Sequence, residues 1–126
     1  MDLRALPVLY ARDVQLLAAF YGCLGFTVQS EFPGADGQIG FVGLRRGSTE
    51  LAVTSKQSPE VLAGVPAGPG PRHELFVYVE NLDASIADVE HAGGQILRAP
   101  AQMPWGETLA YLQDPEGNLV TLAQAT

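Results

Sequence analysis

The chain contains the same pattern twice, and this repeat constrains its fold more than any other feature. In each half an apolar strand ends at a residue that can cap a helix, an amphipathic helix follows, a glycine closes it, and three more strands come after. An offset of 68 residues aligns Asp13 with Asn81 as caps and Gly25 with Gly93 as closing glycines. The sequence therefore predicts an internal duplication of a βαβββ unit. Two unrelated α+β segments that align by chance are the alternative.

The repeat predicts an α+β fold made of two tandem βαβββ modules. One unit alone is a sheet with a single covering helix, which leaves the other face of the sheet unburied. Two units side by side can form a curved sheet around a cleft, with the helices outside. The residues between the units include many prolines and glycines and predict a linker. The expected strands are 7–13, 26–32, 38–44, 48–54, 73–79, 95–101, 107–113 and 118–124, and the expected helices are 14–25 and 82–94.

The acidic charge is concentrated in the second half of the chain. The net charge is −7, so no basic patch is expected that could displace counterions from a nucleic acid, and a nucleic-acid partner is excluded. Residues 64–126 carry eight acidic side chains and only two bases, Arg72 and Arg98. This imbalance favours a cationic small-molecule partner, and a role in solubility alone is the alternative.

Cysteine usage and hydropathy point to a cytoplasmic protein. The single cysteine, Cys23, falls in an apolar helical stretch and is expected to be a buried, inert thiol. The N-terminus lacks the basic-then-apolar layout of a signal peptide. No apolar run approaches the length of a membrane span, so no membrane partner is expected.

Two motifs resemble a known family. YARDVQLLAAFYGCLGF at 10–26 and PWGETLAYLQDPEGNLVTLA at 104–123 are similar to the signatures of the glyoxalase/bleomycin resistance/extradiol dioxygenase superfamily, also called the vicinal oxygen chelate fold. The resemblance implies one such domain over residues 1–126, with module one at about 1–56, a linker at about 57–71 and module two at about 72–126. It also implies a homodimer. Within the superfamily the motifs are most similar to bleomycin resistance proteins, which bind and sequester a drug without chemistry.

The same resemblance implies a metal site that has lost its ligands. In metal-using members four cleft-facing side chains bind a divalent ion, and the corresponding positions here are Leu6, Glu50, Glu74 and Thr121. Leucine supplies no ligand atom, and threonine supplies only a weak neutral hydroxyl. Zinc, nickel and iron normally require imidazole or thiolate groups. We therefore expect no metal, no cofactor and no catalytic residue.

His73 lies next to Glu74 and could restore a metal ligand only if the strand slipped by one residue. In the expected register Glu74 faces the cleft and His73 faces away. A slip would also turn the apolar side chains of this strand out of the helix-covered core. The expected register sends Glu74, Phe76 and Tyr78 into the cleft and Leu75, Val77 and Val79 into the core.

The cleft is expected to carry aromatic rings around carboxylates. Ring faces stack on planar groups and attract cations, and a carboxylate adds a charge-assisted hydrogen bond. Each aromatic residue has a structural alternative, as filler of the sheet interior or as packing on a hairpin. The expected ligand-binding residues are Tyr10, Glu50, Glu74, Phe76, Tyr78, Trp105 and Thr121.

These features together favour a binding protein that sequesters an aromatic, cationic antibiotic or metabolite. A glyoxalase-like lyase, isomerase or dioxygenase with an atypical site, using Glu50 or Glu74 as a general base, is the main alternative. A regulatory or assembly domain without a small ligand is a third hypothesis.

Overall fold

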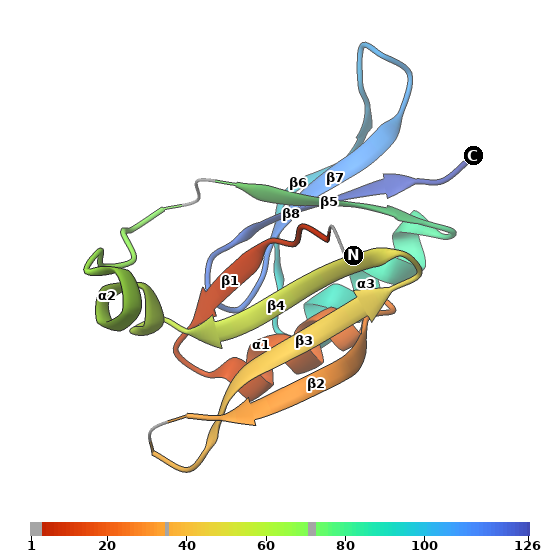
Figure 1. The fold of residues 1–126 in the computed structure, drawn as a ribbon. Helices are drawn as coiled ribbons and strands as arrows, with labels where there is room; N and C mark the ends of the chain where they lie inside the picture. The colour runs from red at the N-terminus through yellow and green to blue at the C-terminus, as the bar shows by residue number, and fades with distance from the viewer. Residues whose placement is uncertain (1–3, 35, 71–72) are drawn as a thin grey trace. The chain divides into compact units, whose positions relative to one another are not determined.

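The computed structural model describes residues 4–34, 36–70 and 73–126 of the chain. The chain divides into two compact units, Met1–Gly68 and Pro69–Thr126, and each is described by itself. Figure 1 follows the chain through the first unit, from red to green, and then through the second, from green to blue.

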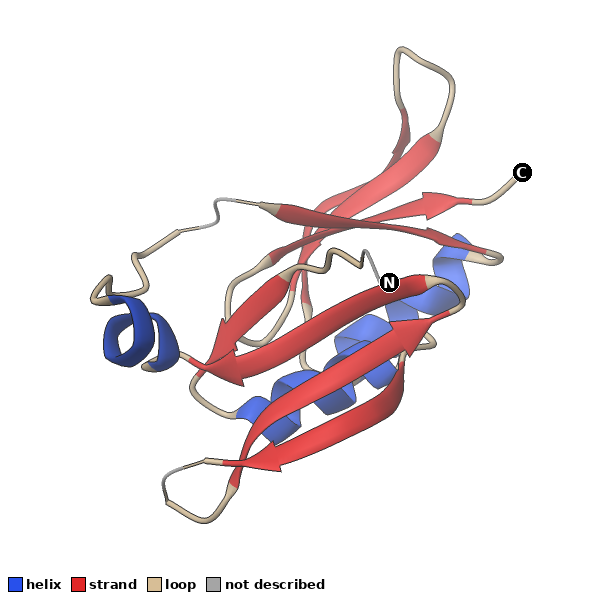
Figure 2. Cartoon of the chain, in the orientation of Figure 1, coloured by secondary structure: helices blue, strands red, loops and turns tan. Residues whose placement is uncertain are grey.

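The first unit is a four-stranded sheet with a helix on one face (Figure 2). The strand order is β1-β4-β3-β2, in which β1 runs parallel to β4 and the other pairs are antiparallel. Its elements are β1 (Val8–Ala11), α1 (Val14–Gly22), β2 (Thr27–Pro33), β3 (Ile39–Arg46), β4 (Thr49–Ser55) and the short α2 (Ser58–Ala63).

The second unit repeats this topology. Its strand order is β5-β8-β7-β6, with β5 parallel to β8. The predicted fold class of tandem βαβββ modules is therefore confirmed. The elements are β5 (Glu74–Val79), α3 (Leu82–His91), β6 (Gln95–Gln102), β7 (Thr108–Gln113) and β8 (Leu119–Gln124).

Both main helices begin at the predicted capping residues. The Asp13 side chain accepts a hydrogen bond from the backbone N–H of Leu16 at 3.0 Å, and the Asn81 side chain accepts one from Ala84 at 3.0 Å. Such caps satisfy N–H groups that have no partner inside the helix and contribute about 1 kcal/mol each. The duplicated pattern of the sequence is therefore reproduced as a duplicated local structure.

Each sheet buries one face against its helix. In the first unit α1 packs on β3 and β4, where Leu51 and Val53 are fully buried. In the second unit α3 packs on β8 and β6, and Val120 and Leu122 are fully buried. Burial of one such side chain stabilises a fold by about 1.5–3 kcal/mol, so these rows of β4 and β8 hold each helix on its sheet.

Two residues discussed in the sequence lie outside the core. His73 is exposed and immediately precedes β5. Cys23 is half-buried, so the expectation of a buried thiol is corrected: it is the C-cap residue of α1 and follows the packed part of that helix. Among the described residues no helix is long and apolar enough to cross a membrane.

Candidate ligand-binding site

Strand β5 presents alternate side chains to opposite faces, as the sequence predicts. Val77 and Val79 are only 4% and 5% exposed, whereas Phe76 and Tyr78 are 38% and 49% exposed. Glu74 is also exposed and lies on the same face as the two rings, because strand side chains alternate with a period of two. The rings of Phe76 and Tyr78 contact each other, with centroids 5.3 Å apart and planes tilted by 50°.

The neighbouring strand β8 contributes Thr121 to the same face of the sheet. Thr121 pairs with Phe76 in the parallel β5–β8 register, and its side chain is fully buried. Its hydroxyl Oγ1 donates to Oε1 of Glu74 at 3.3 Å. The structure therefore brings together Glu74 and Thr121, two of the residues predicted for the site.

Trp105 is presented by a tight turn between β6 and β7. The N–H of Gly106 donates to the carbonyl of Met103 at 2.9 Å, and the N–H of Met103 donates to the carbonyl of Glu107 at 2.8 Å. Pro104 has the fixed φ that suits the second position of such a turn. Gly106 adopts a φ of +102°, which only glycine accepts readily. The PWG sequence thus holds Trp105 at the hairpin tip, 61% exposed.

Glu107 joins the hairpin to β5. Its Oε2 accepts a hydrogen bond from the Tyr78 hydroxyl at 2.6 Å, and its Oε1 accepts one from Nε1 of Trp105 at 2.8 Å. Two donors on one carboxylate must lie within roughly 8 Å of each other. The three rings of Phe76, Tyr78 and Trp105 therefore form one group, which we call the aromatic row.

Glu107 also alters the acidity of Tyr78. Its hydrogen bond to the phenol, partial desolvation and its negative charge together raise the pKa of Tyr78 above the usual 10.0. The phenol consequently stays protonated and remains a donor over the whole neutral range.

Sequence reasoning did not assign a role to Glu107. It was expected only as the first residue of a strand, and its main partner is 29 positions away. The sequence signal for it is the alternation along this strand, which places Glu107 on the same face as Leu109. In the sheet, Leu109 and Tyr78 both pair with Ala123, so Glu107 comes close to Tyr78.

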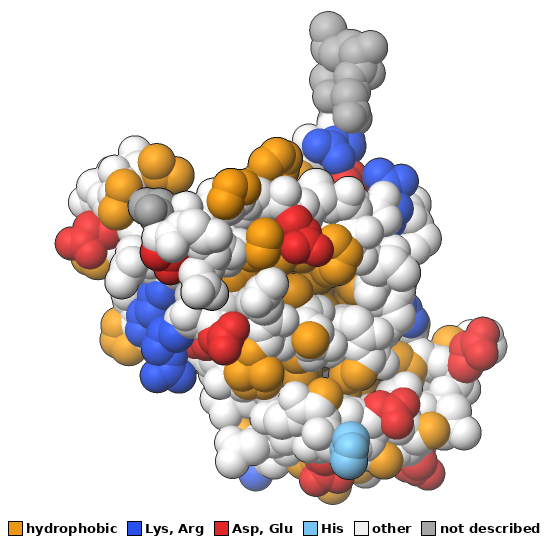
Figure 3. Space-filling view, turned by 90° about the horizontal axis from the view of Figure 1, so that it is seen from below, with side chains coloured by type: hydrophobic (Ala, Val, Ile, Leu, Met, Phe, Trp, Pro, Cys, Tyr) orange, Lys and Arg blue, Asp and Glu red, His pale blue; other side chains and the backbone are white. Residues whose placement is uncertain are grey.

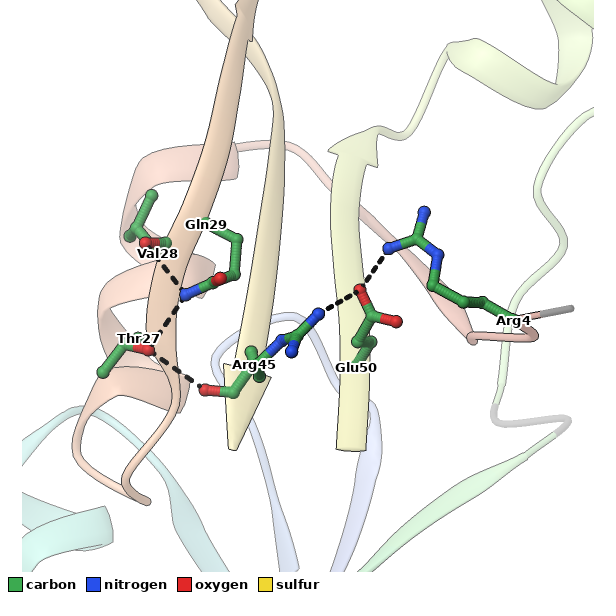
Figure 4. Close-up of polar contacts among 6 residues, drawn as sticks. All are labelled: Arg4, Thr27, Val28, Gln29, Arg45 and Glu50. Carbon is green, nitrogen blue, oxygen red and sulfur yellow. Dashed lines mark hydrogen bonds and ion pairs between the residues drawn. The ribbon is translucent and has the colours of Figure 1, made fainter. Parts of the chain in front are cut away.

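The predicted ligand residue Glu50 is engaged in ion pairs inside the first unit (Figure 4). Its Oε1 lies 2.5 Å from Nη1 of Arg4 and 3.5 Å from Nη2 of Arg45. Arg45 is also its cross-strand neighbour in the β3–β4 register. Two guanidinium groups compensate the charge of Glu50, so it is poorly suited to attract a cation.

The strand registers also change which residue of β4 corresponds to a metal-ligand position of the superfamily. Ala52 lies beside Val8 on β1, and Thr121 lies beside Phe76 on β5, which is the repeat equivalent of Val8. Ala52 is therefore the counterpart of Thr121, and Glu50 lies two residues before that position on β4.

A divalent metal does not fit the donor set. Alanine and leucine supply no ligand atoms, which leaves Glu74 and the weak hydroxyl of Thr121. Within residues 4–34, 36–70 and 73–126 no three histidine, cysteine, aspartate or glutamate side chains cluster in a way that could hold a metal ion. We derive no reaction step through a metal.

The first unit contains an open cavity of about 840 Å³ of its own. It is lined by the β1–α1 connection, the β2–β3 hairpin and the end of β4 with α2. Tyr10, the predicted site residue of this unit, is 41% exposed on β1 and pairs with Thr54, which lines the cavity. Figure 3 shows one face of the molecule, with hydrophobic side chains exposed beside acidic and basic ones. Of the residues that line the cavity, Val61 and Leu62 are strongly exposed.

Comparison with known proteins assigns the family. The model of the Glyoxalase/Bleomycin resistance protein/Dioxygenase superfamily matches residues 5–122. The chain belongs to this superfamily. No curated protein matches it significantly.

Among solved structures, the chain is similar to a bleomycin resistance determinant encoded on the transposon Tn5, at 30% identity over 98% of both chains with a TM-score of 0.62. It is also similar to a bleomycin-binding protein complexed with bleomycin, at 28% identity over 100% of both chains and a TM-score of 0.62. A superfamily enzyme from Burkholderia phytofirmans has 22% identity and a TM-score of 0.82 over 96% of this chain and 97% of its own, which shows the shared fold alone.

Proposed function

We propose that this protein binds and sequesters a planar, cationic aromatic small molecule without metal-dependent chemistry. The observation that carries the proposal is the aromatic row on the second unit, together with the carboxylates of Glu74 and Glu107 beside it. The 30% identity to a bleomycin resistance determinant supports the same kind of ligand.

The row provides the surface that such a ligand needs. Its three rings are between 38% and 61% exposed, so a flat molecule can stack on them without displacing the core. A cation over an aromatic face gains about 0.5–2 kcal/mol per contact, and a neighbouring carboxylate adds a charge-assisted hydrogen bond. The acidic balance of residues 64–126 attracts the same charge at longer range.

Enzymatic turnover has less support. Proton transfer would require a carboxylate with a suitable pKa within reach of a substrate. Glu50 is held by two arginines, and two of the superfamily's four metal positions carry leucine and alanine, Leu6 and Ala52. Glu74 remains as the one predicted general base on the proposed binding face.

Tryptophan fluorescence tests the proposal, because Trp105 is the only tryptophan in the chain. Titration with bleomycin and a panel of planar organic cations is expected to change its emission with a saturable dependence on ligand. The absence of a response across the panel, confirmed by calorimetry, would contradict the proposal. The homodimer implied by the family is also a proposal, and light scattering at low protein concentration tests it.

A further inference from the structure

The ring pair of Phe76 and Tyr78 within the aromatic row lies between two carboxylates. One face of β5 carries, in order, Glu74, Phe76 and Tyr78. Glu107 accepts a hydrogen bond from the Tyr78 hydroxyl. A strand advances about 3.3 Å per residue, so Glu74 and Tyr78 are separated by about 13 Å. Glu74 therefore precedes the ring pair along β5, whereas Glu107 is bonded to the Tyr78 hydroxyl beyond it and also accepts from Trp105.

Both carboxylates are held by neutral donors. Glu74 accepts from the Thr121 hydroxyl, and Glu107 accepts from a phenol and an indole. Unlike Glu50, neither of them forms an ion pair with an arginine or lysine among the described residues. The hydrogen bonds orient the two groups, and no arginine or lysine of the part of the chain that the structure describes neutralises their charges.

Each carboxylate also retains acceptor capacity. A carboxylate offers about four lone-pair sites, and the bonds above use one at Glu74 and two at Glu107. Planar groups with paired N–H donors, such as amidinium and guanidinium, match a carboxylate well because both oxygens can be engaged. The aromatic rings between the ends favour a ligand with a flat apolar middle.

From this arrangement we propose that the binding face selects an elongated aromatic dication, with one cationic group at Glu74 and the other at Glu107. This inference rests on the proposed function and narrows its ligand class. In this proposal Glu107 binds one cationic group of the ligand, in addition to accepting hydrogen bonds from Trp105 and Tyr78.

Calorimetric titration with two matched probes tests the inference. The first is the rod-like aromatic diamidine diminazene, and the second is its analogue in which one amidine is replaced by an uncharged carboxamide. The protein is expected to bind the diamidine at least tenfold more tightly. Glu74→Gln and Glu107→Gln, which keep side-chain size and remove the charge, are each expected to reduce that preference to about twofold. Glu90→Gln is the matched control, because it removes an exposed acid of α3, the helix that covers the other face of the sheet, and is expected to preserve the preference.

The outcomes separate this inference from the proposed function. Equal affinity for the two probes, or a preference that only one of the two glutamates affects, overturns the two-ended site and leaves a binder of single cations. A loss of preference in Glu90→Gln as large as in the other variants shows a general charge effect and also overturns it. If neither probe binds and no planar cation of the fluorescence panel binds, both the inference and the proposed function fail.

Discussion

The hydroxyl of Tyr78 on β5 donates a hydrogen bond to Glu107, just before β7, at 2.6 Å, although β8 lies between these two strands in the sheet. On β8, Ala123 pairs with Tyr78 on one side and with Leu109, two residues after Glu107, on the other. The contact ties the hairpin that carries Trp105 to the edge strand that carries the other two rings.

Tyr78 is expected to ionise only above the usual phenol pKa of 10.0, because ionisation breaks the hydrogen bond to Glu107 and places two negative charges together. Its pKa is higher in the folded than in the unfolded protein, so the associated stability is complete below the unfolded pKa and is lost as pH rises through the folded one. The difference in near-ultraviolet tyrosinate absorbance between the native protein and Tyr78→Phe measures this titration. Glu107→Gln should move the pKa back toward its ordinary value, and an unchanged titration in that variant would show that the contact is not formed.

Trp105→Ala should weaken binding of a planar cation by tenfold or more, because it removes one stacking surface of about 1.4–2 kcal/mol, and 1.4 kcal/mol corresponds to a factor of ten. The indole is 61% exposed, so the melting temperature should change little. Calorimetry gives the affinity and thermal unfolding gives the stability. Trp105→Phe keeps a ring and should restore much of the affinity. Parallel losses of stability and binding in Trp105→Ala would instead indicate a structural role.

Glu50→Gln should lower the free energy of unfolding by about 0.5–1 kcal/mol, because its arginine partners are about half exposed and solvent screens the ion pairs. The loss should be smaller in high salt. Urea unfolding at two salt concentrations measures both effects. Ligand affinity should stay within about twofold of the native value, and a tenfold loss of affinity would return Glu50 to the binding site.

Asp114→Ala should cost about 2–3 kcal/mol of stability. This carboxylate is 4% exposed and accepts hydrogen bonds from the backbone of Glu116 and Asn118 and from the Asn118 amide. Its removal leaves buried donors without partners in the turn before β8. Denaturant unfolding measures the loss, and Asp114→Asn, which keeps one acceptor oxygen, should lose less. A loss below about 0.5 kcal/mol would show that water replaces these bonds.

Much of the fold could be predicted because its signals are local. The caps at Asp13 and Asn81, the closing glycines and the alternation along β5 all depend on residues within one or two turns or on a period of two. The duplication then predicted the topology, since two units with the same element order adopt the same sheet order.

The parts of the site that were not predicted depend on contacts between distant positions. Glu50 was expected to face a ligand, but its partner Arg4 lies 46 positions earlier in the chain. Its place relative to Ala52 is known only from the pairing of β4 with β1, two strands far apart in the sequence. Glu107 reaches Tyr78 across β8, from a position 29 residues later in the chain. None of these relations leaves a periodic pattern in the sequence.

Calorimetric titration of the protein with a planar aromatic cation, once with a strong chelator and once with added zinc, tests the central claim most directly. The account predicts saturable binding with the same affinity and enthalpy in both conditions, and a loss of at least tenfold in Trp105→Ala. Binding that appears only with the metal, or no binding by any cation of the panel, would contradict it.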